Sequence, residues 1–230
     1  MPLALQSRFC GSVYVIQCAG RIVIGEEVIA LEAALDHGAR EFSRFVLDLS
    51  QVTRLDSMGL GLLVRHHTRL HKRGGDLRLA APPDFVTTLL NLTKVSSVLH
   101  SYPTEEEAIL SFLKQHAAQR SEEKRGIKLL MFDPSADLCA FVRTVLTQHG
   151  FDVRTTCSFR DAKILLKVDN VDYILVGPGT PQLSSESVAS ELRAMAPTAS
   201  ALQLAADFKS RDALEASHTL LQMLGVNSAS

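Results

Sequence analysis

The sequence predicts an α/β protein with two domains, and three observations support this prediction. The chain has 230 residues, whereas a single domain commonly holds about 100–150. Short apolar, β-branched segments alternate with segments of helical periodicity, which is typical of a mostly parallel sheet covered by helices. Near residues 105–126 an amphipathic pattern gives way to a polar stretch that ends at Gly126. We therefore expect a first domain at 1–117, a helical linker at 118–126 and a second domain at 127–230.

The expected elements follow from the apolar spacing of each segment. In the first domain they are the strand Ser12–Cys18, the helix Glu26–Ala39, the strand Phe45–Leu49, the helix Leu60–Leu70, the strand Leu77–Ala80, the helix Phe85–Leu92 and a closing helix capped by Thr104. In the second domain the strands are Lys128–Phe132, Phe151–Thr155, Tyr173–Val176 and Ala201–Leu204, and the helices are Asp137–His149, Phe159–Val168 and Ser184–Met195.

The composition excludes several classes of protein. Hydrophobic residues make up 46% of the chain and charged residues 21%, with a formal net charge of −1. Neither whole-chain disorder nor a strongly basic nucleic-acid binder is therefore indicated. No run approaches the ~18 apolar residues of a membrane span, and the N-terminus lacks the pattern of a secretion signal. Because Cys10, Cys18, Cys139 and Cys157 form no C-x-x-C pair, we expect reduced, mostly buried thiols in a cytoplasmic protein.

The dipeptide Asp56-Ser57 follows a buried strand and precedes a helix. Asp and Ser are both good N-caps, so the spacing alone favours a plain helix start. The same position has a second interpretation, because the unpaired N–H groups and partial positive charge of a helix N-terminus stabilise a phosphate. Gly59 and Gly61 would leave the helix start uncrowded for a partner. A phosphoserine adds about −1.5 to −2 charge units, which is enough to switch a docking surface.

Several segments of the first half occur together in one known family. They are Asp48-Leu49, Leu55-Asp56-Ser57-Met58-Gly59-Leu60-Gly61, Gly74-Gly75, a Gly20-x-Ile22 turn and the closing helix from Thr104. On these segments, residues 1–115 resemble the STAS domain of bacterial anti-sigma-factor antagonists. The resemblance implies that Ser57 is phosphorylated by a partner anti-sigma serine kinase and reset by a PP2C-type phosphatase. In such a switch the unphosphorylated form binds the anti-sigma factor and frees the sigma factor.

The resemblance also implies a partner-binding surface around Ser57. Its residues would be Asp56, Met58, Gly59, Leu60, Arg21 and Ile22. The sequence departs from the family in two places: Met58 stands where many members carry a second Ser, and no acidic residue follows Gly20 closely. An altered docking surface is therefore expected.

The segment Arg65–Arg73 is basic and rich in histidine. His67 and His71 are spaced i, i+4, which suits a metal ion, but no third ligand stands at an obvious position. We expect a surface helix end whose cations favour the helix dipole. Recruitment of an acidic partner stays open.

The second half resembles a different family. The segments that carry the resemblance are Leu129–Leu138, Val171–Pro181 and Ala213–Ala216. On these, residues 127–224 resemble the receiver domain of two-component response regulators, which implies a flavodoxin-like parallel sheet.

The chemistry of a working receiver is not retained in this half. Mg²⁺ needs carboxylate oxygens, yet only Asp133 survives among the expected acidic positions. Pro134 follows it, Gly177 stands at the phosphoacceptor position, Ala205 at the switch Thr and Leu224 at the Lys. We therefore predict a receiver-like domain without phosphoryl transfer.

Two further expectations concern the loops and the end of the second domain. The sequence Gly177-x-Gly179 is a weak phosphate-loop signal, and a plain turn is favoured. Because the chain ends at Ser230, before a usual final helix, the sheet would be truncated. We expect Leu220, Leu221 and Leu224 to be exposed and residues 127–230 to self-associate or dock to a signalling protein.

Taken as a whole, the sequence predicts a regulatory switch that is not an enzyme. It shows no Ser/His/Asp order, metal set or P-loop, so no catalytic residue, metal or cofactor is expected. The alternative is a non-switching scaffold of a bacterial signalling complex, in which Ser57 only starts a helix.

Overall fold

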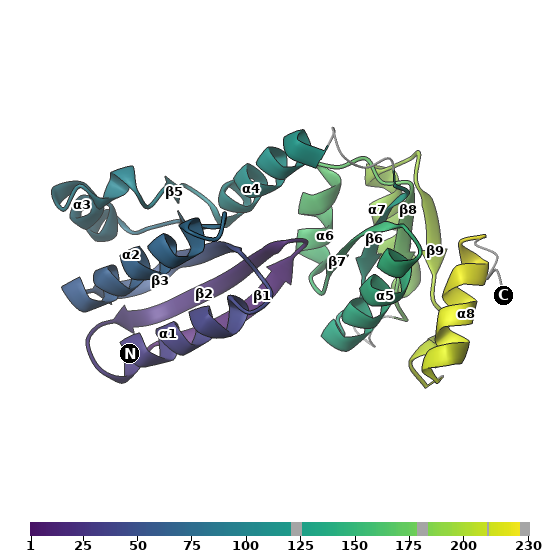
Figure 1. Cartoon of the computed structure of the whole chain (residues 1–230), viewed down its shortest axis with the longest axis horizontal. Coiled ribbons are helices and arrows are strands. Elements are labelled where there is room, and N and C mark those ends of the chain that lie inside the picture. The colour runs from purple at the N-terminus through teal and green to yellow at the C-terminus, as the bar shows by residue number, and fades with distance from the viewer. Residues whose placement is uncertain (121–125, 179–183, 211, 226–230) are drawn as a thin grey trace. The chain divides into compact units, whose positions relative to one another are not determined.

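A computed structural model describes residues 1–120, 126–178, 184–210 and 212–225 (Figure 1). The chain divides into two compact units, 1–115 and 116–230, which are described separately as unit 1 and unit 2. Of the expected linker 118–126, residues 121–125 lie outside the described residues, as does Gly179. In the described ranges no helix is long and apolar enough to cross a membrane.

Unit 1 is a mixed sheet with helices on both faces. Its elements are β1 (Ala4–Cys10), β2 (Val13–Ile22), α1 (Glu26–Gly38), β3 (Arg44–Leu55), α2 (Ser57–His71), β4 (Asp76–Ala80), α3 (Asp84–Leu92), the 3₁₀ turn η1 (Val95–Ser97), β5 (Ser101–Tyr102) and α4 (Glu105–Arg120). The strand order is β5-β4-β3-β2-β1. The β1–β2 pair is antiparallel and the other pairs are parallel.

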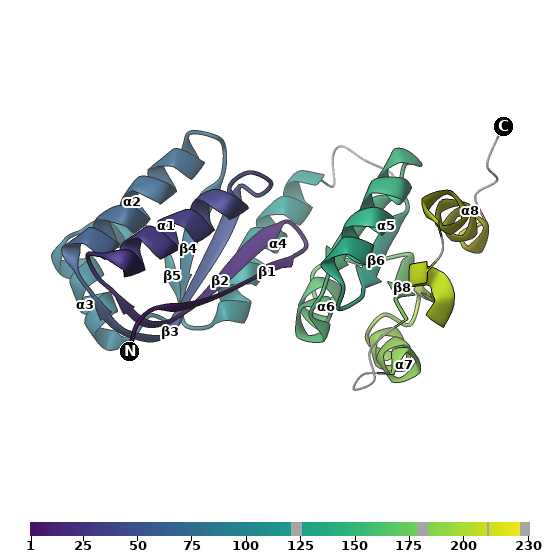
Figure 2. The ribbon, with the colours of Figure 1, turned by 90° about the horizontal axis from the view of Figure 1, so that it is seen from below.

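The two faces of the unit 1 sheet are covered by different helices. Side chains alternate between the faces of a strand, and in β4 Leu77 and Leu79 join a core built with α1, α2 and α3. Arg78 faces the other way, where its guanidinium lies 3.7 Å from the centre of the Phe112 ring of α4. Figure 2 shows α1 and α2 side by side over one face. The sheet therefore holds α2 by its apolar face and leaves the start of that helix at the sheet's edge.

The structure corrects three expectations for unit 1. Strands β1 and β5 were not predicted, and β3 continues to Leu55 instead of ending at Leu49. The Gly20-x-Ile22 segment is not a turn but the end of β2, where the register with β3 shifts between Gly20 and Arg21. Gly20 has φ 106°, and a Cβ there would lie 2.3 Å from the Pro2 carbonyl oxygen, so the close approach of Pro2, which precedes β1, requires glycine.

Unit 2 is a parallel sheet between two pairs of helices. Its elements are β6 (Lys128–Phe132), α5 (Ala136–Gln148), β7 (Asp152–Thr156), α6 (Phe159–Leu166), β8 (Tyr173–Val176), α7 (Ser185–Met195), β9 (Ser200–Gln203), the 3₁₀ turn η2 (Ala206–Ser210) and α8 (Ala213–Met223). The strand order is β7-β6-β8-β9, with all pairs parallel. Helices α5 and α8 contact each other, as do α6 and α7, and the two pairs lie on opposite sides of the sheet (Figure 2).

The end of unit 2 differs from the sequence prediction. The strand order matches the first four positions of the flavodoxin-like order 2-1-3-4-5, and the described residues contain no fifth strand after β9. The segment Ala213–Ala216 is helical, as its resemblance to a receiver helix implied, and it begins α8. Leu220, Leu221 and Leu224 are buried, with 0%, 5% and 7% exposure. The expectation that they are exposed was wrong, because α8 packs its apolar stripe against α5.

Candidate functional site

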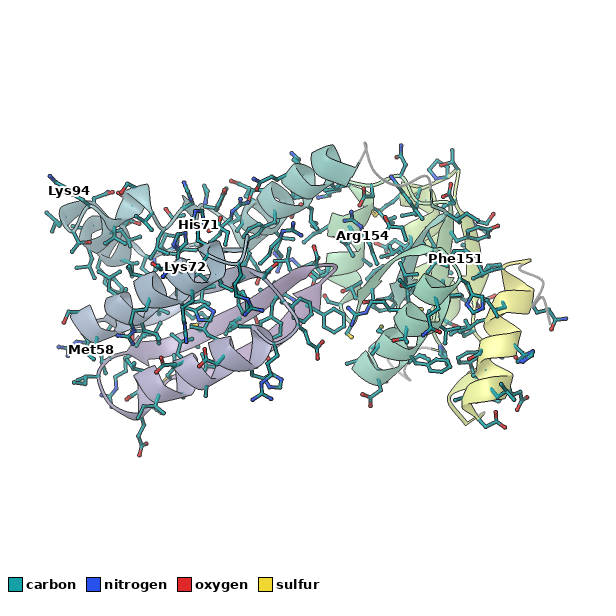
Figure 3. All side chains as sticks on the ribbon, in the orientation of Figure 1. Met58, His71, Lys72, Lys94, Phe151 and Arg154 are labelled. Carbon is teal, nitrogen blue, oxygen red and sulfur yellow. The ribbon has the colours of Figure 1, made fainter. Side chains whose placement is uncertain are left out.

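The candidate site lies at the edge of the unit 1 sheet where β2, β3 and β4 end and α1, α2 and α3 begin. In sheets of this kind the carboxyl ends of the parallel strands meet at one edge, and ligands commonly bind there. Met58, in the first turn of α2, lies at the opposite end of that helix from His71 and Lys72 (Figure 3). At 1.5 Å rise per residue, the helix separates these ends by about 21 Å.

Asp56 organises this edge with a single carboxylate. It is the N-cap of α2, and its Oδ1 accepts hydrogen bonds from the N–H groups of Met58 at 3.0 Å and Gly59 at 2.9 Å. Its Oδ2 accepts from the N–H of Ile24 at 2.8 Å, in the loop between β2 and α1. Asp56 also donates its own N–H to the Ile22 carbonyl at 3.2 Å. One side chain therefore joins the starts of two helices.

The same contacts set the charge of Asp56. The N–H of Gly59, then those of Ile24 and Met58, hold the pKa of the carboxyl below its ordinary value. Arg54 contributes in the same direction by its charge. Asp56 is therefore ionised at neutral pH and works as a fixed negative cap on a positive helix end.

Ser57 is the first residue of α2 and is exposed. Two of the first N–H groups of the helix are already bound to Asp56, so a phosphate on Ser57 would lie next to a carboxylate. This corrects the expectation that the free helix N-terminus itself would hold the phosphate. The added charge would instead act on a molecule that approaches from outside.

Some neighbours of Ser57 are buried beneath the site, and others lie on its surface. Ile22, Gly59 and Leu60 are buried and shape the edge from below, so their predicted part in partner binding stays a prediction. A Cβ on Gly59 would lie 2.7 Å from the Ile22 carbonyl oxygen, which leaves no room for a side chain. A Cβ on Gly61 would meet nothing within 4 Å, so this glycine leaves the outer surface of α2 open.

The exposed rim of the site contains Met58 and Arg21 from the predicted partner surface, together with Ile24, which sequence reasoning did not single out. Met58 is 43% exposed and Ile24 is 69% exposed, so two large apolar side chains are accessible at this rim. Arg21 forms an ion pair with Glu27 at 2.8 Å, and this contact lowers the pKa of Glu27. The residue that follows Gly20, Arg21, is thus paired with an acidic group, Glu27, from the first turn of α1. The acidic pair at residues 26 and 27 was the signal that could have indicated it.

The histidine-rich end of α2 is not the surface cluster that was expected. His66 and His67 are 1% and 8% exposed. Burial, aided by the charge of Arg69, lowers the pKa of His66 to about 4, so its ring is neutral at physiological pH. His67 Nε2 lies 3.1 Å from Asp76 Oδ1. Among the residues described, no group of three or more His, Cys, Asp or Glu is placed to hold a metal ion.

A basic cleft of about 590 Å³ lies beside this end of α2. Its lining includes Arg40, Arg69, Lys72 and Arg73 with one acidic residue, Asp36. Asp36 already pairs with Arg69 at 2.9 Å. The cleft is positively charged, and it lies at the opposite end of α2 from Ser57.

The corresponding edge of unit 2 has a different geometry. Asp133 follows β6, is fully buried, and accepts a hydrogen bond on Oδ1 from the N–H of Ser135 at 2.7 Å. A Cβ on Gly177 would lie 2.1 Å from Asp133 Oδ2. The carboxylate therefore occupies the space that a side chain at position 177 would need. Ala205 is exposed, and Leu224 ends a helix instead of a strand.

Comparison with known proteins supports one of the two resemblances. Residues 5–108 match the family model of the STAS domain. This confirms the STAS prediction for the first half of the sequence, whereas the match does not reach the second half, where the receiver resemblance stays a prediction.

Solved structures similar to this chain include three related regulators. One is an anti-sigma factor antagonist from Mycobacterium paratuberculosis, at 26% identity over 47% of this chain and 92% of that chain, with a TM-score of 0.44. A putative anti-sigma factor antagonist from Thermotoga maritima has 22% identity over 46% and 92% of the two chains, with a TM-score of 0.44. The Bacillus cell fate determinant SpoIIAA in its phosphorylated form has 20% identity over 47% and 99%, with a TM-score of 0.41.

Proposed function

We propose that this chain is a regulator of the anti-sigma-factor-antagonist type that works by partner switching, controlled by phosphorylation of Ser57. The observation that carries the proposal is the geometry at the start of α2. Ser57 is exposed on a rigid, capped helix start, next to exposed Met58 and Ile24. The match of residues 5–108 to the STAS domain supports it. The partners would be an anti-sigma factor with serine kinase activity and a PP2C-type phosphatase, in the cytoplasm.

A physical mechanism connects the phosphate to the switch. A partner that covers Met58 and Ile24 would also cover Ser57. Burying the neutral hydroxyl costs little free energy when the hydroxyl makes one hydrogen bond in the interface. A phosphate of about −1.5 to −2 charge units would lose its hydration in the same contact. The Asp56 carboxylate, ionised and adjacent, adds repulsion. Phosphorylation therefore releases the partner without any change in the fold.

The test uses the serine kinase of the same bacterium with ATP. Wild-type protein should gain one phosphate on Ser57, and Ser57→Ala should gain none while it keeps partner binding. Ser57→Asp should bind at least about tenfold more weakly. Thr68→Asp, with the same charge on the exposed part of the same helix, is the matched control and should bind normally. A phosphate found on another residue by intact-mass and peptide analysis contradicts the proposal.

The scaffold function remains the second candidate because of a specific observation. The start of α2 is explained without any modification, because Asp56 is its N-cap and Ser57 is simply its first residue. In a scaffold, Ser57→Asp and Thr68→Asp would affect binding equally. A difference between these two variants separates the two functions.

For unit 2 we propose a receiver-like interaction domain that does not accept a phosphoryl group. Its support is the Asp133 carboxylate in the space beside Gly177. Acetyl phosphate with Mg²⁺ should leave residues 127–230 unmodified, and an acid-labile phosphate there would contradict this.

Association through unit 2 rests on a different surface from the one expected. In the described residues no strand pairs with the outer side of β9, and Leu214 on α8 is 72% exposed. A chain ending near residue 120 should keep Ser57 phosphorylation but lose assembled mass or one partner. If the shortened and full chains have the same solution mass and the same partners, unit 2 is not an interaction domain.

A further inference from the structure

Unit 2 contains a pair of cysteines that the proposed function does not use. Cys139 lies in the first turns of α5 and Cys157 directly follows β7. Cys139 Sγ lies 3.4 Å from the Asp133 carbonyl oxygen and 3.6 Å from the Thr156 carbonyl oxygen. The second of these carbonyls belongs to the peptide bond that leads into Cys157. Cys139 Sγ therefore lies against the backbone at Cys157, and each thiol shifts the pKa of the other.

The two thiols differ in their access to solvent. Cys139 is fully buried, whereas Cys157 is partly exposed. A small oxidant can therefore reach Cys157 before it reaches Cys139, whose sulfur lies deeper in unit 2. The other two cysteines of the chain, Cys10 and Cys18, are buried at 0% and 2% exposure.

The electrostatics of the pair point to the same order of reaction. The hydrogen bond from Cys139 lowers the pKa of the Cys157 thiol, against the effects of burial and of the Asp133 and Asp161 carboxylates. The same hydrogen bond and burial raise the pKa of Cys139. In unit 1, burial raises the pKa of Cys18 to about 12. The thiolate is the reactive form, so Cys157 is the more reactive thiol of the pair, while Cys139 keeps its proton, which the Asp133 and Thr156 carbonyl oxygens accept.

We propose that Cys157 is a peroxide-sensitive modification site and that Cys139 is its resolving thiol, so that oxidation closes a disulfide between the start of α5 and the end of β7. A hydroperoxide is the oxidant. Sensor cysteines combine access, a lowered pKa and a neighbouring resolving thiol; Cys157 is partly exposed, its pKa is lowered, and Cys139 lies against its backbone. Unit 2 would then respond to redox conditions at the strand edge where a receiver would respond to phosphate. This proposal is independent of Ser57.

The chemistry proceeds in two balanced steps. The Cys157 thiolate attacks one oxygen of the peroxide, the O–O bond breaks, and Cys157 becomes a sulfenic acid while the other oxygen leaves as water or an alcohol after taking a proton. Cys139 sulfur then attacks Cys157 sulfur, an S–S bond forms, and the sulfenic hydroxyl leaves with the Cys139 proton as water. The two thiols lose two electrons and two protons in total, and the peroxide is reduced.

The experiment treats the full chain with hydrogen peroxide, blocks remaining thiols by alkylation, and measures intact mass and cross-linked peptides. Before alkylation, oxidised wild type should weigh about 2 Da less than the reduced chain, and it should give one peptide pair joining Cys139 to Cys157, reversed by a thiol reductant. Before oxidation, Cys157 should be alkylated at least about tenfold faster than Cys10 or Cys18. In Cys139→Ala, Cys157 should stop at the sulfenic acid and be trapped by dimedone. Cys10→Ala is the matched control and should still form the disulfide.

Three results would overturn the proposal. They are alkylation of Cys157 no faster than that of Cys10, oxidation of wild type to a sulfinic acid without the cross-link, and disulfides that join only separate chains. If Cys139→Ala fails to fold, the wild-type cross-link and the Cys157→Ser variant, which should form none, decide the question.

Discussion

At the strand ends of unit 1 an aspartate side chain faces outward, and at the strand ends of unit 2 one faces inward. Asp56 caps α2, holds the neighbouring loop and leaves Ser57 exposed. Asp133 is fully buried and lies in the space beside Gly177. Both edges belong to parallel strands followed by helices, so the fold alone does not decide whether such an edge is a site. Whether the edge can act as a site depends on one or two residues, which either leave it open to solvent or occupy it.

The largest effect is expected where the unit 2 edge is filled. In Gly177→Ala the new Cβ would lie 2.1 Å from Asp133 Oδ2 and 2.6 Å from its Cβ and Cγ. Overpacking of a buried site should cost unit 2 about 3 kcal/mol. The two units need not unfold together, so the stability of unit 2 has to be measured separately. Hydrogen exchange of the backbone amides of β8, the strand that precedes Gly177, measures it. Adding Asp133→Ala to Gly177→Ala should recover part of the loss, and additive effects in this double-mutant cycle would contradict the contact.

A smaller effect is expected from two glycines at the open edge of unit 1. Gly59→Ala places a Cβ 2.7 Å from the Ile22 carbonyl oxygen and should lower the free energy of unfolding of unit 1 by about 2 kcal/mol. Gly61→Ala meets nothing within 4 Å and should raise it by about 0.5–1 kcal/mol, because alanine is the better helix former. Urea unfolding of both variants measures the difference. Equal effects would show that Gly59 is not held against Ile22.

Removal of the cap itself should cost less. Asp56→Ala should lose about 1 kcal/mol at pH 7, and Asp56→Asn, also a good N-cap, should lose less. Because the pKa of Asp56 is lowered in the folded protein, the charged carboxylate stabilises the fold above the ordinary Asp pKa of about 3.9. That contribution is lost as the pH falls through the lower folded value. The stability gap between wild type and Asp56→Asn should therefore narrow in acid, and a constant gap would contradict the assignment.

The smallest effect on stability is expected at Ser57. Its side chain is exposed and Asp56 already caps the helix, so Ser57→Ala should change the free energy of unfolding by less than about 0.5 kcal/mol. Thermal unfolding next to Asp56→Ala gives the comparison. A loss as large as that of Asp56→Ala would mean that Ser57 has a structural role, which favours the scaffold.

Periodicity predicted most of the fold and failed where polar sequence is held by its neighbours. The bounds of β6 and β8 agree with the prediction, because both are short, buried, apolar strands. The second half of β3 was missed because Ser50–Arg54 is mostly polar. Its pairing with β2, which reaches Leu55 opposite Ile22, extends the strand where local composition would end it.

The candidate site was predicted in its position and not in its contacts. The order of Asp, Ser and Gly marked the start of α2, and the structure places all three there. Sequence could not show that Asp56 also binds Ile24, since those residues are 32 positions apart. It also could not show that Asp133 turns inward, because the space beside Gly177 exists only once β6 and β8 are paired.

The three hydrogen bonds to Asp56 also limit how the proposed phosphorylation of Ser57 could take place. Many protein kinases thread an extended, unfolded segment through their active site, and Ser57 cannot be presented in that way without breaking the contacts to Ile24, Met58 and Gly59. An enzyme acting here must accept the hydroxyl on the surface of a folded helix start. A short synthetic peptide around Ser57 would then be a poor substrate, and selectivity would come from the shape of the whole unit instead of from a local sequence motif.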